Sequence, residues 1–193
     1  MRFFLFLFFL CCLFRCKKEV FPKPKAQLRL EYAKPSYEIK NIDSLPFLFQ
    51  TNSLLSKFHV KQFKSLVGAY AINLEYTSLK GTIFMTYRPI DRRKDNLKSF
   101  LKDAQKLTLE HTIKADEIPF YPYENKMRKV YGGLSEVRGN VASPIQFYIT
   151  DSVQHFLTGS LYFYAKPNFD SILPAIDYLK KDTKQIMETV VWQ

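Results

Sequence analysis

Cysteine is almost absent from this chain. All three cysteines of the 193-residue sequence, Cys11, Cys12 and Cys16, lie within its first sixteen residues. The remaining chain therefore cannot be cross-linked by disulfides, and its fold must come from a hydrophobic core. It is long enough for one domain with a sizeable core and too short for two domains to be expected.

Histidine is also scarce, and the sequence motifs of common catalytic and nucleotide-binding sites are missing. The three histidines, His59, His111 and His155, do not have the spacing of metal ligands. The chain contains no glycine-rich phosphate loop and no G-x-S-x-G elbow. We therefore predict no metal site, no cofactor and no catalytic residue.

One cluster comes closest to a catalytic group. Asp151, Ser152 and His155 place an acid, a hydroxyl and an imidazole within five residues. Serine catalysis needs the imidazole to be oriented by the acid and bonded to the hydroxyl. Asp-Ser is also common in tight turns, because both side chains bond nearby backbone amides. A turn is the favoured interpretation, and an envelope enzyme or ligand-binding domain with its site near this turn is the alternative.

Long apolar runs are missing, with one exception near the start. Arg2 is followed by an unbroken apolar run from Phe3 to Phe14. This run has about 12 residues, whereas a helix needs roughly 20 to cross a bilayer. A basic residue followed by a short apolar run is typical of an export signal, so residues 1–15 are predicted to be a signal peptide.

The end of this segment indicates a lipoprotein. Leu13 stands three residues before Cys16, as in lipoprotein signals, and Cys16 is therefore the predicted lipidation site. Arg15 departs from the small residue that normally precedes such a cysteine. Cys11 and Cys12 are weaker candidates because they lie inside the apolar run. An ordinary secretory signal with incidental cysteines is the remaining alternative.

The charge is strongly unbalanced. Lys and Arg number 29 against 18 Asp and Glu, which gives a formal charge of +11. For an exported protein, such a charge favours anionic lipid headgroups or acidic polymers over nucleic acid, although solubility alone would also explain it. Residues 16–26 contain four lysines and the two prolines Pro22 and Pro24, so they are predicted to form an extended tether.

The rest of the chain, residues 27–193, is predicted to form one α+β domain. Apolar alternation indicates a strand around 28–32, a hairpin of 70–76 and 82–88 with a turn at Gly81, and three strands at 127–137, 145–150 and 156–165. The stretch 33–68 is less legible.

Helical periodicity appears twice. One helix is predicted from Asp95 or Asn96 to about Lys114, and a second from Asp170 onward. The second carries an apolar stripe consisting of Ile172, Ile176, Leu179, Thr183, Ile186 and Val190. The order of elements predicts a largely antiparallel β-sheet with two long helices packed on it.

Several ordered segments resemble the GldD family of gliding-motility lipoproteins. They include the prolines and lysines of 22–25, Tyr87-Arg88-Pro89-Ile90, residues 111–116, Val130-Tyr131-Gly132, and above all 139–163 with Ala142-Ser143-Pro144-Ile145 and Gly159-Ser160-Leu161. The resemblance covers roughly residues 16–193. It implies an envelope lipoprotein that is needed for gliding and for the associated type IX protein secretion machinery, with no enzymatic activity assigned. It also supports lipidation at Cys16.

Two further expectations concern location and modification. Lys17 and Lys18 directly follow the cysteine, where surface-exported lipoproteins of Bacteroidota tend to have acidic residues. The expected location is therefore the periplasmic face of the outer membrane, with the inner membrane as the alternative. Ser44, in Asp43-Ser44-Leu45, fits an O-glycosylation pattern of exported Bacteroidota proteins. Ser152 and Ser171 fit the same pattern, but turn and cap chemistry explains them. The expected partners are the membrane and other gliding or secretion proteins.

Overall fold

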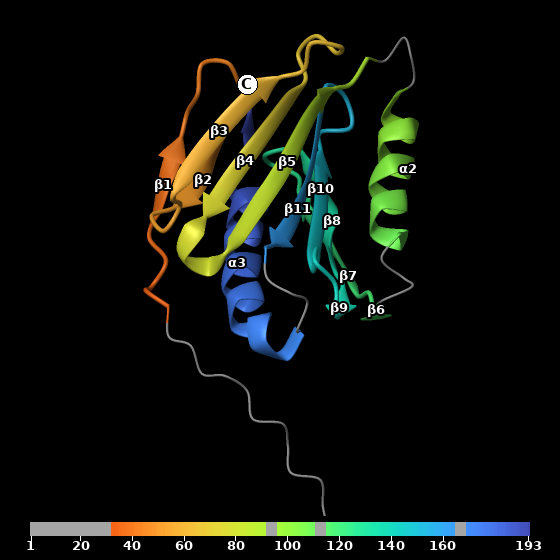
Figure 1. Cartoon of the computed structure of the whole chain (residues 1–193). Coiled ribbons are helices and arrows are strands. Elements are labelled where there is room, and N and C mark those ends of the chain that lie inside the picture. The colour runs from red at the N-terminus through yellow and green to blue at the C-terminus, as the bar shows by residue number, and fades with distance from the viewer. Residues whose placement is uncertain (1–31, 92–95, 111–114, 165–168) are drawn as a thin grey trace, which may run out of the picture.

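The computed structural model describes residues 32–91, 96–110, 115–164 and 169–193. Figure 1 shows how these parts are arranged. The predicted signal peptide, Cys16, the tether and most of the strand expected at 28–32 lie outside the described residues, as does His111. Within the described ranges, no helix combines the length and apolar character needed to cross a membrane.

A seven-stranded antiparallel sheet is the centre of the fold. Its strand order is β3-β4-β5-β11-β10-β8-β7. The bounds are Lys57–Gln62 for β3, Tyr70–Tyr76 for β4, Gly81–Pro89 for β5, Phe120–Asn125 for β7, Val130–Glu136 for β8, Ile145–Thr150 for β10 and His155–Phe163 for β11.

Two smaller sheets and two helices complete the described chain. One small sheet contains β1 (Tyr37–Lys40), β2 (Phe47–Asn52) and β12 (Val191–Trp192), and the other pairs β6 (Ala115–Glu117) with β9 (Arg138–Gly139). The helices are α2 (Asn96–Leu109) and α3 (Phe169–Thr189), and a short 3-10 turn, η1, covers Thr77–Leu79. The protein is therefore α+β and mostly antiparallel, as predicted.

Strand alternation gives the large sheet two different faces. On β5, Ile83, Met85 and Tyr87 are buried and belong to the main core, whereas Phe84 and Thr86 point to the opposite face. Cross-strand partners share a face, so the same division continues through all seven strands. One face packs on α3 and β2, and the other lies on the side of α2 (Figure 1).

Helix α3 packs on the core face of the large sheet. Its predicted stripe is confirmed for Ile176, Leu179, Thr183 and Ile186, and for Val190 directly after the helix, all of which are almost fully buried. Ile172, at the start of the stripe, is only partly buried. At roughly 1.5–3 kcal/mol for each large aliphatic side chain, this burial holds the helix firmly on the sheet. Gly81 allows the close approach, since a Cβ there would lie 2.8 Å from Leu179 Cδ1.

Helix α2 is packed less completely than predicted. Phe100 is buried among the residues of its apolar stripe, but Leu107 and Leu109 are 43% and 61% exposed. The helix ends at Leu109 rather than at about Lys114, and residues 111–114 lie outside the description. The prediction of two long helices packed on the sheet is therefore only partly met, because α2 is shorter and less completely packed than expected.

Two other local predictions need correction, and one stretch without a prediction can now be assigned. The strand expected at 127–137 begins at Val130, because Met127 lies in a turn. The β4 to β5 hairpin is present, but its left-handed residue is Lys80 (φ 50°) rather than Gly81. The stretch 33–68, which was not legible, contains the strands β1, β2 and β3.

Candidate functional site

The cluster at 151–155 forms a closed turn between β10 and β11. One carboxylate oxygen of Asp151 accepts hydrogen bonds from three backbone N–H groups, those of Val153 (2.9 Å), Gln154 (2.8 Å) and His155 (2.8 Å). Ser152 has a φ of 65°, and its backbone N–H donates to the hydroxyl of Thr150. The carboxylate of Asp151 therefore organises the turn.

The imidazole of His155 belongs to the core. Its Nδ1 lies 2.8 Å from the hydroxyl of Tyr87, and its ring stacks on Trp192 with centroids 5.0 Å apart. Burial raises the pKa of Tyr87 to about 12, so the phenol stays protonated. The imidazole tautomer decides which of the two groups donates in this hydrogen bond. Burial also lowers the pKa of His155, against the opposing charge of Asp151. The structure thus pairs His155 with Tyr87, not with the acid or hydroxyl that a catalytic triad requires.

The other residues considered for chemistry do not converge. His59 is exposed on β3, with Nε2 3.7 Å from Glu75. Among the described residues, no group of three or more His, Cys, Asp or Glu is placed to hold a metal ion. Ser44, the candidate glycosylation site, lies in the exposed loop between β1 and β2.

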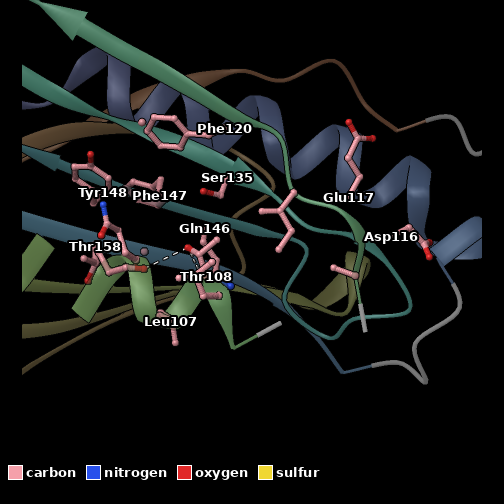
Figure 2. A pocket seen from close by; sticks show the side chains of 17 residues that line it. Leu107, Thr108, Asp116, Glu117, Phe120, Ser135, Gln146, Phe147, Tyr148 and Thr158 are labelled. Carbon is pink, nitrogen blue, oxygen red and sulfur yellow. Dashed lines mark hydrogen bonds between the residues drawn. The ribbon is translucent and has the colours of Figure 1, made fainter. Parts of the chain in front are cut away.

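A cavity of about 620 Å³ lies between α2 and the sheet. We call it the α2 groove. Its walls come from the second half of α2, from residues 115–118, and from β7, β8, β10 and β11. Figure 2 shows these side chains converging from the helix and from the strands. The groove lies on the α2 face of the sheet, away from the core that α3 covers.

Aromatic rings form one wall of the α2 groove. Phe120 and Tyr148 are stacked with centroids 6.5 Å apart, and Tyr148 stacks on Phe156 at 6.1 Å. Phe120 is 50% exposed, so one end of this row is open to solvent. Gly133 makes room for the row, because a Cβ there would lie 2.3 Å from the ring of Phe120.

The inner part of the groove is polar. Gln146 is only 3% exposed, and its side-chain oxygen accepts a hydrogen bond of 2.9 Å from the hydroxyl of Thr108 (Figure 2). Its amide nitrogen has no hydrogen-bond partner among the described residues. An unpaired buried polar group costs about 1–3 kcal/mol of folding free energy. The fold therefore gains nothing from this nitrogen.

The mouth of the groove is acidic. Asp116 and Glu117 line it, and Glu117 is paired with Arg138 at 2.7 Å. No lysine, arginine or histidine is among the described residues that line the groove. Because Arg138 compensates the charge of Glu117, the negative charge of the mouth rests on Asp116.

Two buried carboxylates lie on the opposite face and serve the core. Burial opposes ionisation of Glu136, but Lys180 and Arg138 hold its pKa below the usual range. Burial raises the pKa of Asp182, which accepts hydrogen bonds from Asn52 and Tyr37. Both groups join α3 to strands, which is a structural task.

Sequence reasoning missed the α2 groove. The stripe of α2 was interpreted as core, although its last two leucines reach the groove and solvent instead. The one available signal was Gln146, a polar amide between Ile145 and Phe147 in a strand where every residue except Tyr148 is buried.

Comparison with known proteins identifies the family. The family of gliding motility lipoprotein GldD matches over residues 17–192. The chain belongs to this family, as its resemblance predicted, and this implies a membrane-anchored location in the cell envelope. The family is one of motility lipoproteins and is not known as an enzyme family. No curated protein and no solved structure matches the chain.

Proposed function

We propose that this GldD family member is a lipid-anchored, non-catalytic assembly component of the gliding and type IX secretion machinery, and that it holds a partner protein in the α2 groove. The observation that carries the proposal is the groove itself, which combines exposed apolar side chains with an unpaired buried amide. The occupant is a peptide segment with an apolar side chain next to a basic residue. Its apolar part suits Leu107, Leu109 and Phe120, and its charge suits the acidic mouth.

A second candidate, an enzyme or ligand-binding domain at the 151–155 turn, has less support. The Asp151 carboxylate is occupied by turn amides, and His155 is stacked and bonded inside the core. The α2 groove, where the polar groups do converge, is lined by neither residue. A partner-binding role, in contrast, uses the cavity beside α2 and the side chains that line it.

A pair of matched substitutions tests the groove. Leu109→Lys adds a positive charge beside the acidic mouth and opposes a basic occupant. Ile39→Lys on β1 is the control, because Ile39 and Leu109 are 62% and 61% exposed. Both variants should fold, since neither side chain is buried. We expect Leu109→Lys to impair gliding and secretion at a normal protein level, and Ile39→Lys to leave both intact. Equal effects of the two variants would contradict the proposal.

The organisation of the chain is part of the proposal. Residues 1–15 are the signal peptide, residues 16–26 are the lipidated Cys16 and its tether, and residues 27–193 are one domain. Stable attachment takes two membrane signals, and each buried CH₂ of an acyl chain contributes about 0.8 kcal/mol. Cys16→Ser should release the protein from the membrane fraction. Two results together would contradict lipidation at Cys16: the Cys16→Ser variant stays in the membrane fraction, and the wild-type protein has the mass of a chain without lipid.

The side of the membrane and the modification of Ser44 are tested separately. We place the domain on the periplasmic side, at the outer membrane, so protease added to intact cells should leave it intact. We also propose O-glycosylation at Ser44, whose loop position is accessible. The intact mass should exceed that of the lipidated polypeptide, and Ser44→Ala should abolish the difference. A wild-type mass equal to the lipidated polypeptide alone would exclude the modification.

A further inference from the structure

The register of the sheet brings several loops to one end of the molecule. Gln62 pairs with Tyr70, and Asn125 pairs with Val130, so the loop 63–69 and the turn 126–129 each close a hairpin. Tyr70 pairs with Tyr87 near the end of β5, where Pro89 meets the first residue of β11. Thr150, the last residue of β10, pairs with Tyr131 near the start of β8. Both hairpin loops therefore lie at the same end, which is the upper end in Figure 1.

This end, which we call the tip end, exposes apolar side chains on both hairpins. In the loop 63–69, Phe63, Leu66 and Val67 are 40%, 42% and 87% exposed. In the turn 126–129, Met127 is 97% exposed. Single exposed apolar residues are ordinary, but three within five residues of one loop are not.

The backbone holds the loop 63–69 in shape. The N–H of Phe63 donates to the carbonyl of Ala69, and the N–H of Ala69 donates to the carbonyl of Leu66. Ala69 is fully buried, and Gly68 takes a left-handed conformation with a φ of 77°. The exposed side chains are thus presented by an ordered loop, which reduces the entropy that a surface contact would cost.

Basic residues surround these apolar side chains. Lys61 and Lys64 flank Phe63, and Lys126, Arg128 and Lys129 flank Met127, all of them exposed. The nearby carboxylates are largely occupied. Glu124 lies 3.7 Å from Lys126, and Asp151 binds the amides of its own turn. Exposed apolar side chains flanked by basic residues are typical of segments that bind anionic membrane interfaces.

We propose that the tip end contacts an anionic lipid bilayer, with Leu66 and Val67 entering the interface and the lysines facing the headgroups. The two hairpin loops are at opposite edges of the sheet, roughly 24 Å apart along the sheet at about 4.8 Å per strand spacing, so they form two separate points of contact. The contact orients the domain on the membrane, which an acyl anchor alone does not do.

The length of the chain before the domain permits this orientation. Strand β1 enters from the opposite end, because Tyr37 pairs with the last residue of β2 while Phe47, the first, pairs with Trp192. The nine residues of β5 span about 30 Å. Tyr32 is sixteen positions after Cys16, and a chain of this length extends to at most roughly 55 Å. The anchor and the tip end can therefore reach the same membrane.

The position of the cysteines gives a clean test. Once Cys16 is acylated and the leader removed, the chain has no free thiol, so one introduced cysteine can carry an environment-sensitive dye. Val67→Cys labels the loop, and Ser78→Cys labels the exposed turn before β5 at the opposite end. The lipidated protein is reconstituted into vesicles of phosphatidylcholine with or without phosphatidylglycerol. Both labelled chains carry the same anchor, so anchoring cannot account for a difference between them.

We expect the dye at position 67 to shift to shorter wavelength and to be quenched by nitroxide-labelled lipids in the vesicles with phosphatidylglycerol. The dye at position 78 should show neither effect. Removing the charges with Lys61→Gln and Lys64→Gln should weaken the contact about fivefold per lysine. An equal response at both positions, or none at position 67, would overturn the proposal. The proposal would also be overturned if position 67 crosslinked to a protein in cells while its dye showed no shift on vesicles. That result would identify the loop as a protein-binding surface.

Discussion

The turn at 151–155 gives the sharpest test of whether this protein carries chemistry. Replacing Asp151 by Ala removes an acceptor that binds the backbone N–H groups of Val153, Gln154 and His155. Loss of one side-chain cap typically costs about 0.5–2 kcal/mol. The N–H groups of Val153 and Gln154 can bind water instead, whereas that of the buried His155 is less accessible. We therefore expect Asp151→Ala to lower the free energy of unfolding by about 2–3 kcal/mol.

Urea denaturation measures this change. With a slope of about 2 kcal/mol per molar, the midpoint should fall by about 1–1.5 M. Asp151→Asn is the matched control, because its side-chain oxygen can still accept from the turn, and it should cost less than about 1 kcal/mol. An unchanged midpoint in Asp151→Ala would refute the structural account of the turn.

Function separates the two interpretations of the same cluster. If Asp151 only shapes the turn, Asp151→Asn should glide and secrete normally at a normal protein level. Cells with the His155→Gln variant should also glide and secrete when the variant is present at a normal level. The variant itself should be less stable, because it loses the stacking of His155 on Trp192. An abundant, folded His155→Gln or Asp151→Asn variant that lacks both processes would refute the non-catalytic reasoning.

Three further substitutions test the packing and the groove. Gly159→Ala places a Cβ 2.2 Å from the ring of Phe147, so we expect a loss of about 1–3 kcal/mol in denaturation, partly restored by adding Phe147→Leu. Burial raises the pKa of Asp182, so ionisation of this group destabilises the fold as pH rises above about 4. Asp182→Asn should remove that loss, and denaturation at acidic and neutral pH should show a smaller difference than in the wild type. Gln146→Met removes the unpaired amide nitrogen and should leave stability equal or higher by about 1 kcal/mol while impairing gliding, a combination that a purely structural residue would not give.

Much of the fold followed from local periodicity. The alternation in β4 and β5 and the stripe of α3 both predicted the face that is buried, because each pattern records burial against one large surface. β2 alternates equally well, with Phe47 and Phe49 buried. It was not recognised because the strand is short and follows Pro46, and because one of its partners is β12, near the other end of the chain.

The groove could not be predicted, because it depends on distances between elements. Periodicity shows that α2 has an apolar stripe, but it does not show how much of that stripe the sheet covers. The groove lies along the second half of α2, beyond the contact of Phe100 with Phe156, where Thr108 still bonds Gln146 of the sheet. The same limit applied to the tip end, since Met127 was assigned to a strand and its exposure depends on where the turn falls.

The packing of α2 suggests why a helix of this length is present at all. A helix of 14 residues is marginal in water, so it must be held by tertiary contacts. Those contacts are few. Phe100 packs on Phe156 beneath the guanidinium of Arg88, which also bonds Asp103 at 3.0 Å, and Thr108 bonds Gln146 near the other end. Between and beyond these points the apolar stripe remains partly uncovered. Full packing, as in α3, would have closed the groove and buried Leu107. The partial packing therefore costs stability and keeps an apolar surface open beside the sheet, which is the arrangement that a binding site requires.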